Sequence, residues 1–298
     1  MVYANSVSET GGAASTPLVA LDSTFDDEVA NAPGALALSA SEIALAAREL
    51  DGAPPLEALL WAAARFAPRL AFATGFGPEG CVLVDLIGRH ELPVDVFTLD
   101  TGLLFVETRQ LWRRLESRYG LTIRAVRPEL SLERQAALHG DSLWARHPDR
   151  CCELRKVRPL RAALAGHQAW IAAIRRDQTA ARAAAQVVEE DRAFGLVKVN
   201  PLVGWSSEQV WEHLREHRVP TSTLHERGYA SVGCWPCTTP VAAGEDPRAG
   251  RWRGQAKTEC GLHLRSIVGA DDHGDAQRGA PREGNDSSPL VVIGGLSR

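Results

Sequence analysis

Short apolar runs alternate with longer amphipathic segments through the middle of this chain. Apolar runs typical of buried strands cover residues 70–73, 94–99, 121–126, 169–174 and 196–199. Apolar residues at helical spacing or helix-start signals cover residues 39–50, 56–66, 81–90, 105–119, 131–139, 150–157 and 206–218. Strands that alternate with helices favour a parallel sheet with right-handed crossovers. We therefore expect an α/β fold.

Polar residues mark the beginnings of two of these helices. Ser39 and Glu42 have the spacing of a capping box, and so do Ser206 and Gln209. Residues 180–185 favour a helix by propensity alone, although they lie where a binding loop at a strand end is expected. We include them among the expected helices.

Composition divides the chain into three segments. Residues 1–38 are rich in Ser, Ala, Gly and Asp without periodicity, which predicts a flexible arm. Residues 39–241 carry the alternating pattern and form the expected α/β domain. Residues 242–298 are mostly polar and Gly-rich, which predicts a flexible tail.

Charge and hydropathy narrow the class of protein. The net charge is −4 and the pI is about 6.2, so bulk electrostatics do not favour a nucleic-acid partner. The first 22 residues lack the basic and apolar regions of a signal peptide, and no apolar run is long enough to span a bilayer. We expect a cytoplasmic protein whose thiols are reduced. The sequence does not determine the oligomeric state and is compatible with a homo-oligomer.

Four of the six cysteines form two close pairs, Cys151-Cys152 and Cys234 with Cys237. The side chains of adjacent cysteines point in different directions, so they are better placed to bind two different metal ions of a cluster than one ion of a mononuclear site. A [4Fe-4S] cluster offers four irons, one for each thiolate, and is the interpretation we favour. A zinc site is an alternative, as are disulfides or idle thiols.

Two expected strand ends carry residues suited to a nucleotide. Gly75, Gly77 and Gly80 follow the first strand, where backbone N–H groups and a helix N-terminus can bind an anion. A plain structural turn would use the same glycines. Asp100 and Thr101 follow the second strand, where Asp100 could hydrogen-bond adenine or ribose, or either residue could cap a helix.

Basic residues cluster in three places although the net charge is negative. They are Arg155, Lys156, Arg158 and Arg161, then Arg175, Arg176 and Arg182, then Arg248, Arg251 and Arg253. Guanidinium groups donate paired hydrogen bonds to the oxygens of phosphate and sulfate. A site to which all three clusters contribute would therefore bind a compact polyanion. We assign Arg158, Arg161 and Arg253 to a solvated surface.

The two remaining cysteines differ in their surroundings. Cys81 lies among Val82, Leu83 and Val84 and is expected to be a buried small hydrophobe. Cys260 lies in a polar segment with basic neighbours, which would lower its pKa and make it a nucleophile. An idle surface thiol is the competing interpretation.

At this point the sequence resembles the assimilatory adenylyl-sulfate reductases, within the phosphoadenylyl-sulfate reductase group. The first matching motifs are Ala73-Thr74-Gly75-Phe76-Gly77-Pro78-Glu79, Leu99-Asp100-Thr101-Gly102, Cys151-Cys152-Glu153-Leu154-Arg155-Lys156 and Arg175-Arg176-Asp177-Gln178. The later ones are Gly233-Cys234-Trp235-Pro236-Cys237-Thr238, Arg248-Ala249-Gly250-Arg251-Trp252 and Glu259-Cys260-Gly261-Leu262-His263. They run in order over about residues 70 to 263, and the paired cysteines together with the final motif are the most specific.

The resemblance implies a Rossmann-like fold of the adenine nucleotide alpha hydrolase-like type. It implies that adenosine 5′-phosphosulfate binds along the strand ends, that Cys260 attacks the sulfate sulfur, and that thioredoxin releases sulfite from the S-sulfocysteine. Lys156 would lie between cluster and sulfate as a second catalytic residue. The implied substrate-binding residues are Thr74, Gly75, Phe76, Gly77, Asp100, Arg175, Arg176, Arg248 and Arg251.

Three other functions remain as alternatives. Reduction of the 3′-phosphorylated nucleotide is the nearest, but relatives with that activity typically lack the four cluster cysteines. An ATP-using adenylating or thiolating enzyme on the same fold would want an Asp in the pyrophosphate loop, which this loop lacks. A metal-binding interaction module would leave Cys260 and the arginines at the strand ends without a purpose.

Overall fold

The computed structural model describes residues 36–262, which form a six-stranded sheet in the order β3-β2-β1-β4-β6-β5. The strands are β1 (Leu70–Ala73), β2 (Asp95–Leu99), β3 (Arg124–Val126), β4 (Ala169–Ile171), β5 (Val188–Asp191) and β6 (Leu196–Val199). All neighbouring strands pair in parallel except β5 and β6, which are antiparallel. The predicted parallel α/β sheet is confirmed.

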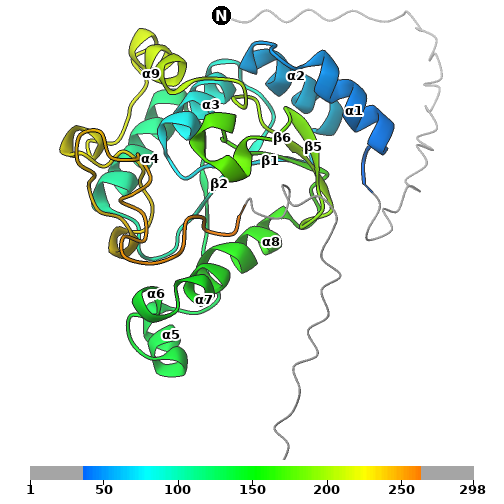
Figure 1. Cartoon of the computed structure of the whole chain (residues 1–298). Helices are drawn as coiled ribbons and strands as arrows, with labels where there is room; N and C mark the ends of the chain where they lie inside the picture. Colours follow the sequence, from blue (N-terminus) through cyan, green and yellow to red (C-terminus); the bar gives the residue numbers. More distant parts are fainter. Residues whose placement is uncertain (1–35, 263–298) are drawn as a thin grey trace, which may run out of the picture.

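Helices cover both faces of the sheet (Figure 1). The longer ones are α1 (Ala40–Glu49), α2 (Pro55–Phe66), α3 (Pro78–Arg89), α4 (Val106–Tyr119), α5 (Leu132–His139), α8 (Arg158–Leu164) and α9 (Ser207–Glu216). The short α6 (Leu143–Arg146) and α7 (Pro148–Cys152) precede a π-helical turn at Glu153–Val157. Strands β1, β2 and β3 follow one another from the centre of the sheet to one edge. The chain then crosses back, and β4 pairs with the other side of β1. Right-handed crossovers therefore place α3 and α4 on one face and α8 on the other.

The core lies between the central strands and these helices. The side chains of Phe72, Phe97, Trp170 and Ile171 are at most 1% exposed. Strands covered on both faces read as continuous apolar runs, which is the pattern seen in the sequence. Leu59 of α2 is also fully buried, so the helix before β1 belongs to the same core.

Most predicted element positions agree with the structure. The capping boxes at Ser39 and Ser206 are both present, at α1 and α9. The predicted helix at 180–185 is wrong, because only a single 3-10 turn, Ala180–Arg182, forms there. Its backbone is directed by tertiary contacts, since Arg176 Nε donates to the Ala185 carbonyl over 2.9 Å.

Strand β5 was not predicted. Its sequence, Val-Glu-Glu-Asp, has no apolar run, and only Val188 and Asp191 are buried. The strand forms because it completes an edge by pairing with β6 and because Asp191 accepts a hydrogen bond of 3.1 Å from Trp170 Nε1. Hydrophobic periodicity gives no signal for an edge strand held in this way.

Residues 242–262 pack against the domain rather than standing apart from it. Trp252 is 3% exposed, and Thr238 forms a β-bridge with Arg251. A Cβ atom on Gly250 would lie 2.1 Å from the Thr239 carbonyl oxygen, so only glycine fits this crossing. The predicted arm at 1–38 and tail at 242–298 lie largely outside the described residues and stay predictions.

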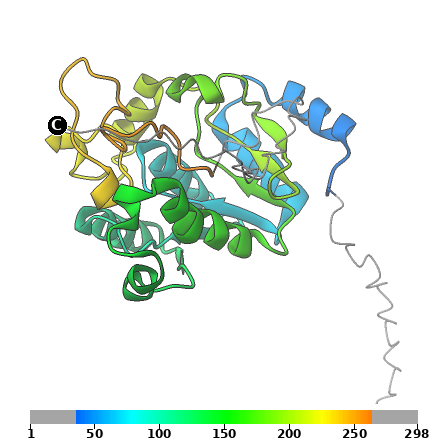
Figure 2. The same cartoon turned by 60° about the horizontal axis from the view of Figure 1, so that its bottom comes forward.

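The chain from about residue 228 lies at the end of the molecule opposite α1 and α2, and its last part, drawn in orange, runs back toward the middle (Figures 1 and 2). This segment contains the second cysteine pair and Cys260. Within residues 36–262 there is no helix with the length and apolarity that a membrane crossing requires.

Candidate functional site

A cavity of about 620 Å³ opens at the carboxyl ends of β1, β2 and β4. Thr74, Gly75 and Gly77 line one side of it, between β1 and the N-terminus of α3. Gly77 is the N-cap of α3 without a side-chain cap, so the first N–H groups of the helix remain available to an anion. The predicted Gly-rich binding loop thus lies at the cavity.

Five basic side chains from distant parts of the chain line the same cavity. They are Lys156, Arg175, Arg182, Arg248 and Arg251. Four of them belong to the predicted site, whereas Arg182 was noted only as a basic residue near a strand end. Several guanidinium groups in one partly enclosed space favour a ligand with closely spaced anionic groups.

Three other predicted substrate-binding residues do not line this cavity. Asp100 accepts hydrogen bonds from Arg109 at 3.0 Å and from Arg127 at 3.3 Å. Phe76 is 3% exposed and stacks on Trp112 with 5.8 Å between ring centroids. These two residues therefore stabilise the walls of the site, and their predicted contact with substrate stays a prediction.

Arg176, the third of these residues, faces away from the cavity. Its guanidinium pairs with Asp51 at 3.0 Å and donates to the Ala185 carbonyl oxygen at 2.9 Å. Its sequence neighbour Arg175 lines the cavity and pairs with Glu79 at 2.9 Å. The extended backbone at Arg175 sends consecutive side chains to opposite sides.

The four paired cysteines converge beside this cavity. Cys151 and Cys152 lie at the end of α7, and all four thiols line one small space between α7 and the loop of Cys234 and Cys237. Burial, together with the neighbouring thiols, raises the pKa of Cys151 to about 12 and that of Cys237 to about 11. Thiols in such a place need a bound cation to become thiolates.

The donor set of this small space consists of four thiols. Within residues 36–262, no group of three or more His, Cys, Asp or Glu side chains is spaced to hold one ion. Four thiols nevertheless line a common space, and the Thr101 hydroxyl lies 3.3 Å from Cys234 Sγ. A cluster with one iron for each thiolate fits this arrangement, because its corners are separate.

The π-helical turn after Cys152 directs two basic side chains. Arg155 is 4% exposed and donates to the Thr101 carbonyl at 2.6 Å and to Gln135 at 3.1 Å, which joins this turn to the end of β2 and to α5. Lys156 lines both the cysteine space and the larger cavity. Burial lowers its pKa, but Cys234, Cys260 and Cys152 outweigh this and raise it, so Lys156 stays charged.

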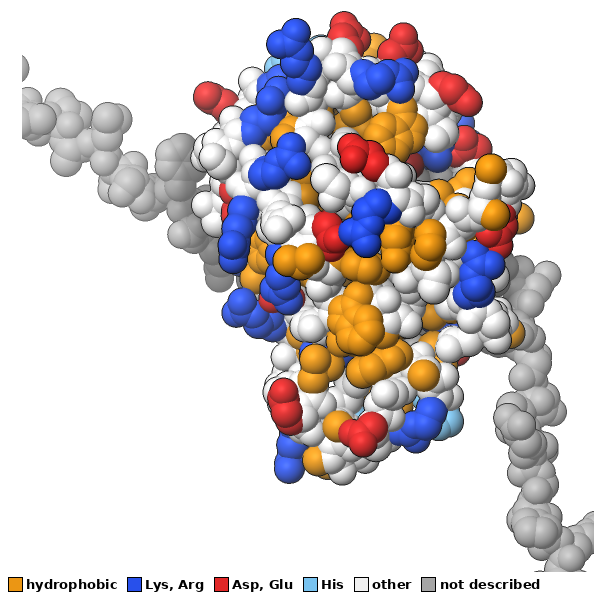
Figure 3. All heavy atoms as spheres, turned by 90° about the vertical axis from the view of Figure 1, so that its left-hand side faces the viewer, with side chains coloured by type: hydrophobic (Ala, Val, Ile, Leu, Met, Phe, Trp, Pro, Cys, Tyr) orange, Lys and Arg blue, Asp and Glu red, His pale blue; other side chains and the backbone are white. Residues whose placement is uncertain are grey.

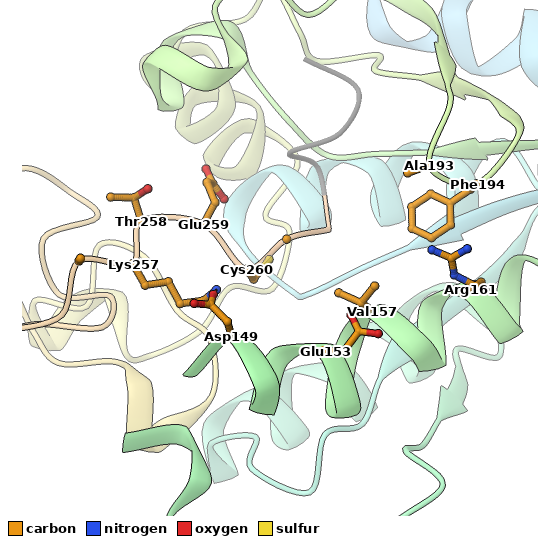
Figure 4. A pocket seen from close by; sticks show the side chains of 12 residues that line it. Asp149, Glu153, Val157, Arg161, Ala193, Phe194, Lys257, Thr258, Glu259 and Cys260 are labelled. Carbon is orange, nitrogen blue, oxygen red and sulfur yellow. The ribbon is translucent and has the colours of Figure 1, made fainter. Parts of the chain in front are cut away.

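Cys260 lies between the large cavity and a second, outer cavity of about 510 Å³. Figure 4 shows the Cys260 segment crossing above the helix that carries Asp149, Glu153, Val157 and Arg161. These four residues are spaced by four, so they form one face of the α7–α8 helix. One thiol is thus placed at the nucleotide-sized cavity and at an outer opening.

Two residues at the site, Arg182 and Glu259, were missing from the predicted site set. Glu259 is 6% exposed and pairs with Arg182 at 3.0 Å and with Arg248 at 3.1 Å. The position of Glu259 beside Cys260 was visible in the sequence, but its partners, 77 positions away in the case of Arg182, were not.

Comparison with known proteins agrees with this geometry. Residues 69–240 match the family model described as the phosphoadenosine phosphosulfate reductase domain. The chain belongs to this family. The resemblance stated from the motifs is therefore confirmed at the level of the family and its fold.

Two curated relatives are similar to 70% of this chain. An adenosine 5′-phosphosulfate reductase from Bacillus velezensis is 46% identical over 209 residues, which is 70% of this chain and 90% of that protein. Adenosine 5′-phosphosulfate reductase 1 from Bacillus subtilis is 47% identical over the same share of each chain.

A solved structure of the same family shares the fold. The phosphoadenylyl-sulfate reductase from Candida auris, solved as a phosphate complex, has a TM-score of 0.62 and 34% sequence identity. The match covers 69% of this chain and 100% of that one.

Proposed function

We propose that this protein is an adenylyl-sulfate reductase, an oxidoreductase of assimilatory sulfate reduction that releases sulfite and AMP from adenosine 5′-phosphosulfate. One observation carries the proposal: Cys260 and five basic side chains meet at a single cavity at the strand ends. The names of the Bacillus relatives support the same substrate. The basic groups suit its phosphate and sulfate oxygens, and the cavity at the strand ends suits its adenosine.

The chemistry assigns a covalent role to Cys260. Its thiolate attacks the sulfate sulfur, an S–S bond forms, the S–O bond to the phosphate breaks, and AMP leaves. The charges of Lys156 and Arg175 stabilise the oxygens on which negative charge grows. A dithiol partner of the thioredoxin type then attacks Cys260 Sγ, releases sulfite, and leaves as a disulfide after its second thiol frees Cys260. The dithiol supplies the two electrons.

A protein reductant needs a surface on which to dock. Figure 3 shows hydrophobic side chains gathered across the middle of the face that lies at the left in Figure 1, with Lys and Arg around them. Trp235, within the second cysteine pair, is 52% exposed and contacts Trp144 at 6.2 Å between ring centroids. Apolar groups exposed together favour contact with another protein, and reduced thiols fit a cytoplasmic setting.

We further propose that Cys151, Cys152, Cys234 and Cys237 hold one [4Fe-4S] cluster per chain. The group, when bound, would keep the four cysteines as thiolates beside Lys156, which favours the charged ammonium near the sulfate, while the external dithiol supplies the electrons. The chain's own residues set the rest: Arg155 fixes the π-helical turn, and Thr101 contacts Cys234.

The substrate experiment separates this proposal from its nearest alternative. The solved Candida auris relative is named for the 3′-phosphorylated nucleotide, so both nucleotides are tested with the same reducing system. We expect a clear preference in kcat/KM for adenylyl sulfate. Equal values, or a preference for the 3′-phosphorylated form, would reject the assignment. An ATP-dependent adenylating activity would give Cys260 no role at the cavity.

A further inference from the structure

Glu259 is a buried carboxylate that two arginines of the nucleotide cavity share. Its Oε2 lies 3.0 Å from Arg182 Nη2 and 3.1 Å from Arg248 Nη2, and its Oε1 accepts a weaker hydrogen bond of 3.4 Å from Thr179. The side chains of Glu259 and Arg182 are 5% and 7% exposed. A carboxylate this deeply buried requires such partners, because removing one would leave an uncompensated charge.

Both arginine partners of Glu259 belong to the lining of the cavity. Arg182 Nη1 donates to Gln178 and Nη2 to Glu259, and its buried Nε has no hydrogen-bond partner within residues 36–262. Arg182 and Arg248 both line the cavity, so the guanidinium groups that pair with Glu259 are among the basic groups that an anionic ligand would meet.

The segment around Cys260 is held on both sides. Lys257 pairs with Asp149 of α7, and its ammonium lies 5.3 Å from the centroid of the Trp252 ring. Figure 4 shows Lys257 directed at Asp149 while Glu259 points away from it. The pairs of Lys257 with Asp149 and of Glu259 with Arg182 are directed to different parts of the domain. They therefore fix the position of residues 257–260, which form no helix or strand of their own.

We propose that Glu259 is the positioning residue for the nucleophile: its pairs with Arg182 and Arg248 hold Cys260 over the cavity through the same arginines that bind the nucleotide. Substrate binding and closure of the Cys260 segment are thereby coupled through shared guanidinium groups. This proposal rests on the proposed function only in its reaction step. A reacting thiolate displaced by about 1 Å loses on the order of a hundredfold in rate.

The first test reads the position of Cys260 without any turnover. The cluster-containing protein is treated anaerobically with iodoacetamide, and alkylation of Cys260 is followed by peptide mapping. Glu259→Gln keeps the shape but removes the charge, so we expect alkylation at least about fivefold faster than in wild type, since opening a held segment raises its exposure. Glu259→Asp keeps the charge and should give an intermediate rate. The matched control is Glu245→Gln, which breaks the pair of Glu245 with Arg253 in the same segment but outside the cavity.

The second test separates positioning from binding. Without Glu259 the two arginines are no longer neutralised, so Glu259→Gln should bind AMP as tightly as wild type or more tightly. Formation of the sulfonate on Cys260 in a single turnover should nevertheless fall by at least about tenfold. Glu245→Gln should leave both unchanged.

Specific results would overturn the proposal. Alkylation of Cys260 in Glu259→Gln at the wild-type rate would do so, and so would weaker AMP binding. Loss of iron or of thermal stability in both Glu259 variants would also do so, because it would assign Glu259 a structural role. Failure of the reductase assay in wild type would reject the proposed function instead, and the alkylation and AMP measurements would still decide the role of Glu259.

Discussion

Arg175 and Arg176 are neighbours in the sequence, but their guanidinium groups lie in different environments. Arg175 is 9% exposed in its side chain and pairs with Glu79 at the cavity, at a distance of 2.9 Å. Arg176 is 34% exposed in its side chain and pairs with the solvated Asp51 at 3.0 Å. Of the two adjacent arginines that follow β4, only Arg175 lines the cavity.

This difference predicts unequal effects of two substitutions. Arg175→Ala removes a charged donor from the cavity, so we expect KM for adenylyl sulfate to rise about tenfold or more. Arg176→Ala removes a pair with a solvated partner and should change KM by less than about threefold. Steady-state kinetics of the two variants under identical conditions checks this. A larger KM effect for Arg176→Ala would restore Arg176 as the substrate ligand expected from the sequence.

The cysteine space predicts which thiols hold iron. Anaerobically purified protein should contain iron and acid-labile sulfide in equal amounts, about four of each per chain. Cys152→Ser should lose most of both. Cys81→Ala is the control, because Cys81 is 1% exposed in the core and burial raises its pKa to about 12. Lys156→Ala should keep the iron and lose turnover. Stoichiometric zinc without sulfide would contradict the cluster.

Cys260 should carry the covalent intermediate. Wild type mixed with adenylyl sulfate and no dithiol should release about one AMP per chain and gain a sulfonate on Cys260, the burst that covalent catalysis gives. Cys260→Ser should keep the iron and nucleotide binding but make no sulfite. Intact mass and peptide mapping locate the adduct. An adduct on Cys81, or AMP release without any adduct, would show that the mechanism is different.

Asp85 should make stability depend on pH in the acid range. It is fully buried between α3, α4 and α9, where Tyr119 and His213 each contact it at 2.8 Å. Burial alone would raise its pKa, but hydrogen bonds from His213 and Tyr119 and the charge of Arg89 hold the pKa below its usual value. A lowered carboxyl pKa stabilises the fold above the unfolded value of about 3.9 and ceases to do so as pH falls through the folded value.

Asp85→Asn should therefore lower the free energy of unfolding at pH 7 by about 1–3 kcal/mol. The difference from wild type should shrink as pH falls below about 4, because the unfolded carboxyl is protonated first, and it should be smallest once pH has fallen through the lowered pKa of the folded state. Urea titrations followed by tryptophan fluorescence measure it. Glu190→Gln, in an exposed pair with Arg192, is the control and should change stability by less than about 1 kcal/mol. A difference that is the same at pH 3 and pH 7 would contradict the role of the charge.

Local patterns in the sequence determined the sheet, its main helices and the kinds of groups at the site. Central strands are mostly apolar because both faces are covered, so Leu70–Ala73 and Leu196–Val199, which is interrupted only by Lys198, were recognisable without the structure. The helix starts at Ser39 and Ser206 depend on side chains only three positions apart. The cysteine pairs and the motif of Cys260 carry their chemistry in residue type and spacing alone.

Tertiary structure decided which of these groups face the cavity. Asp100 pairs with Arg109 and Arg127, and Glu259 pairs with Arg182 across 77 positions of sequence. Such pairings depend on which elements the fold brings together, and burial then makes an unpaired charge too costly to leave. A sequence pattern records the periodicity of one element at a time, so it cannot show which partner on another element a charged side chain will meet.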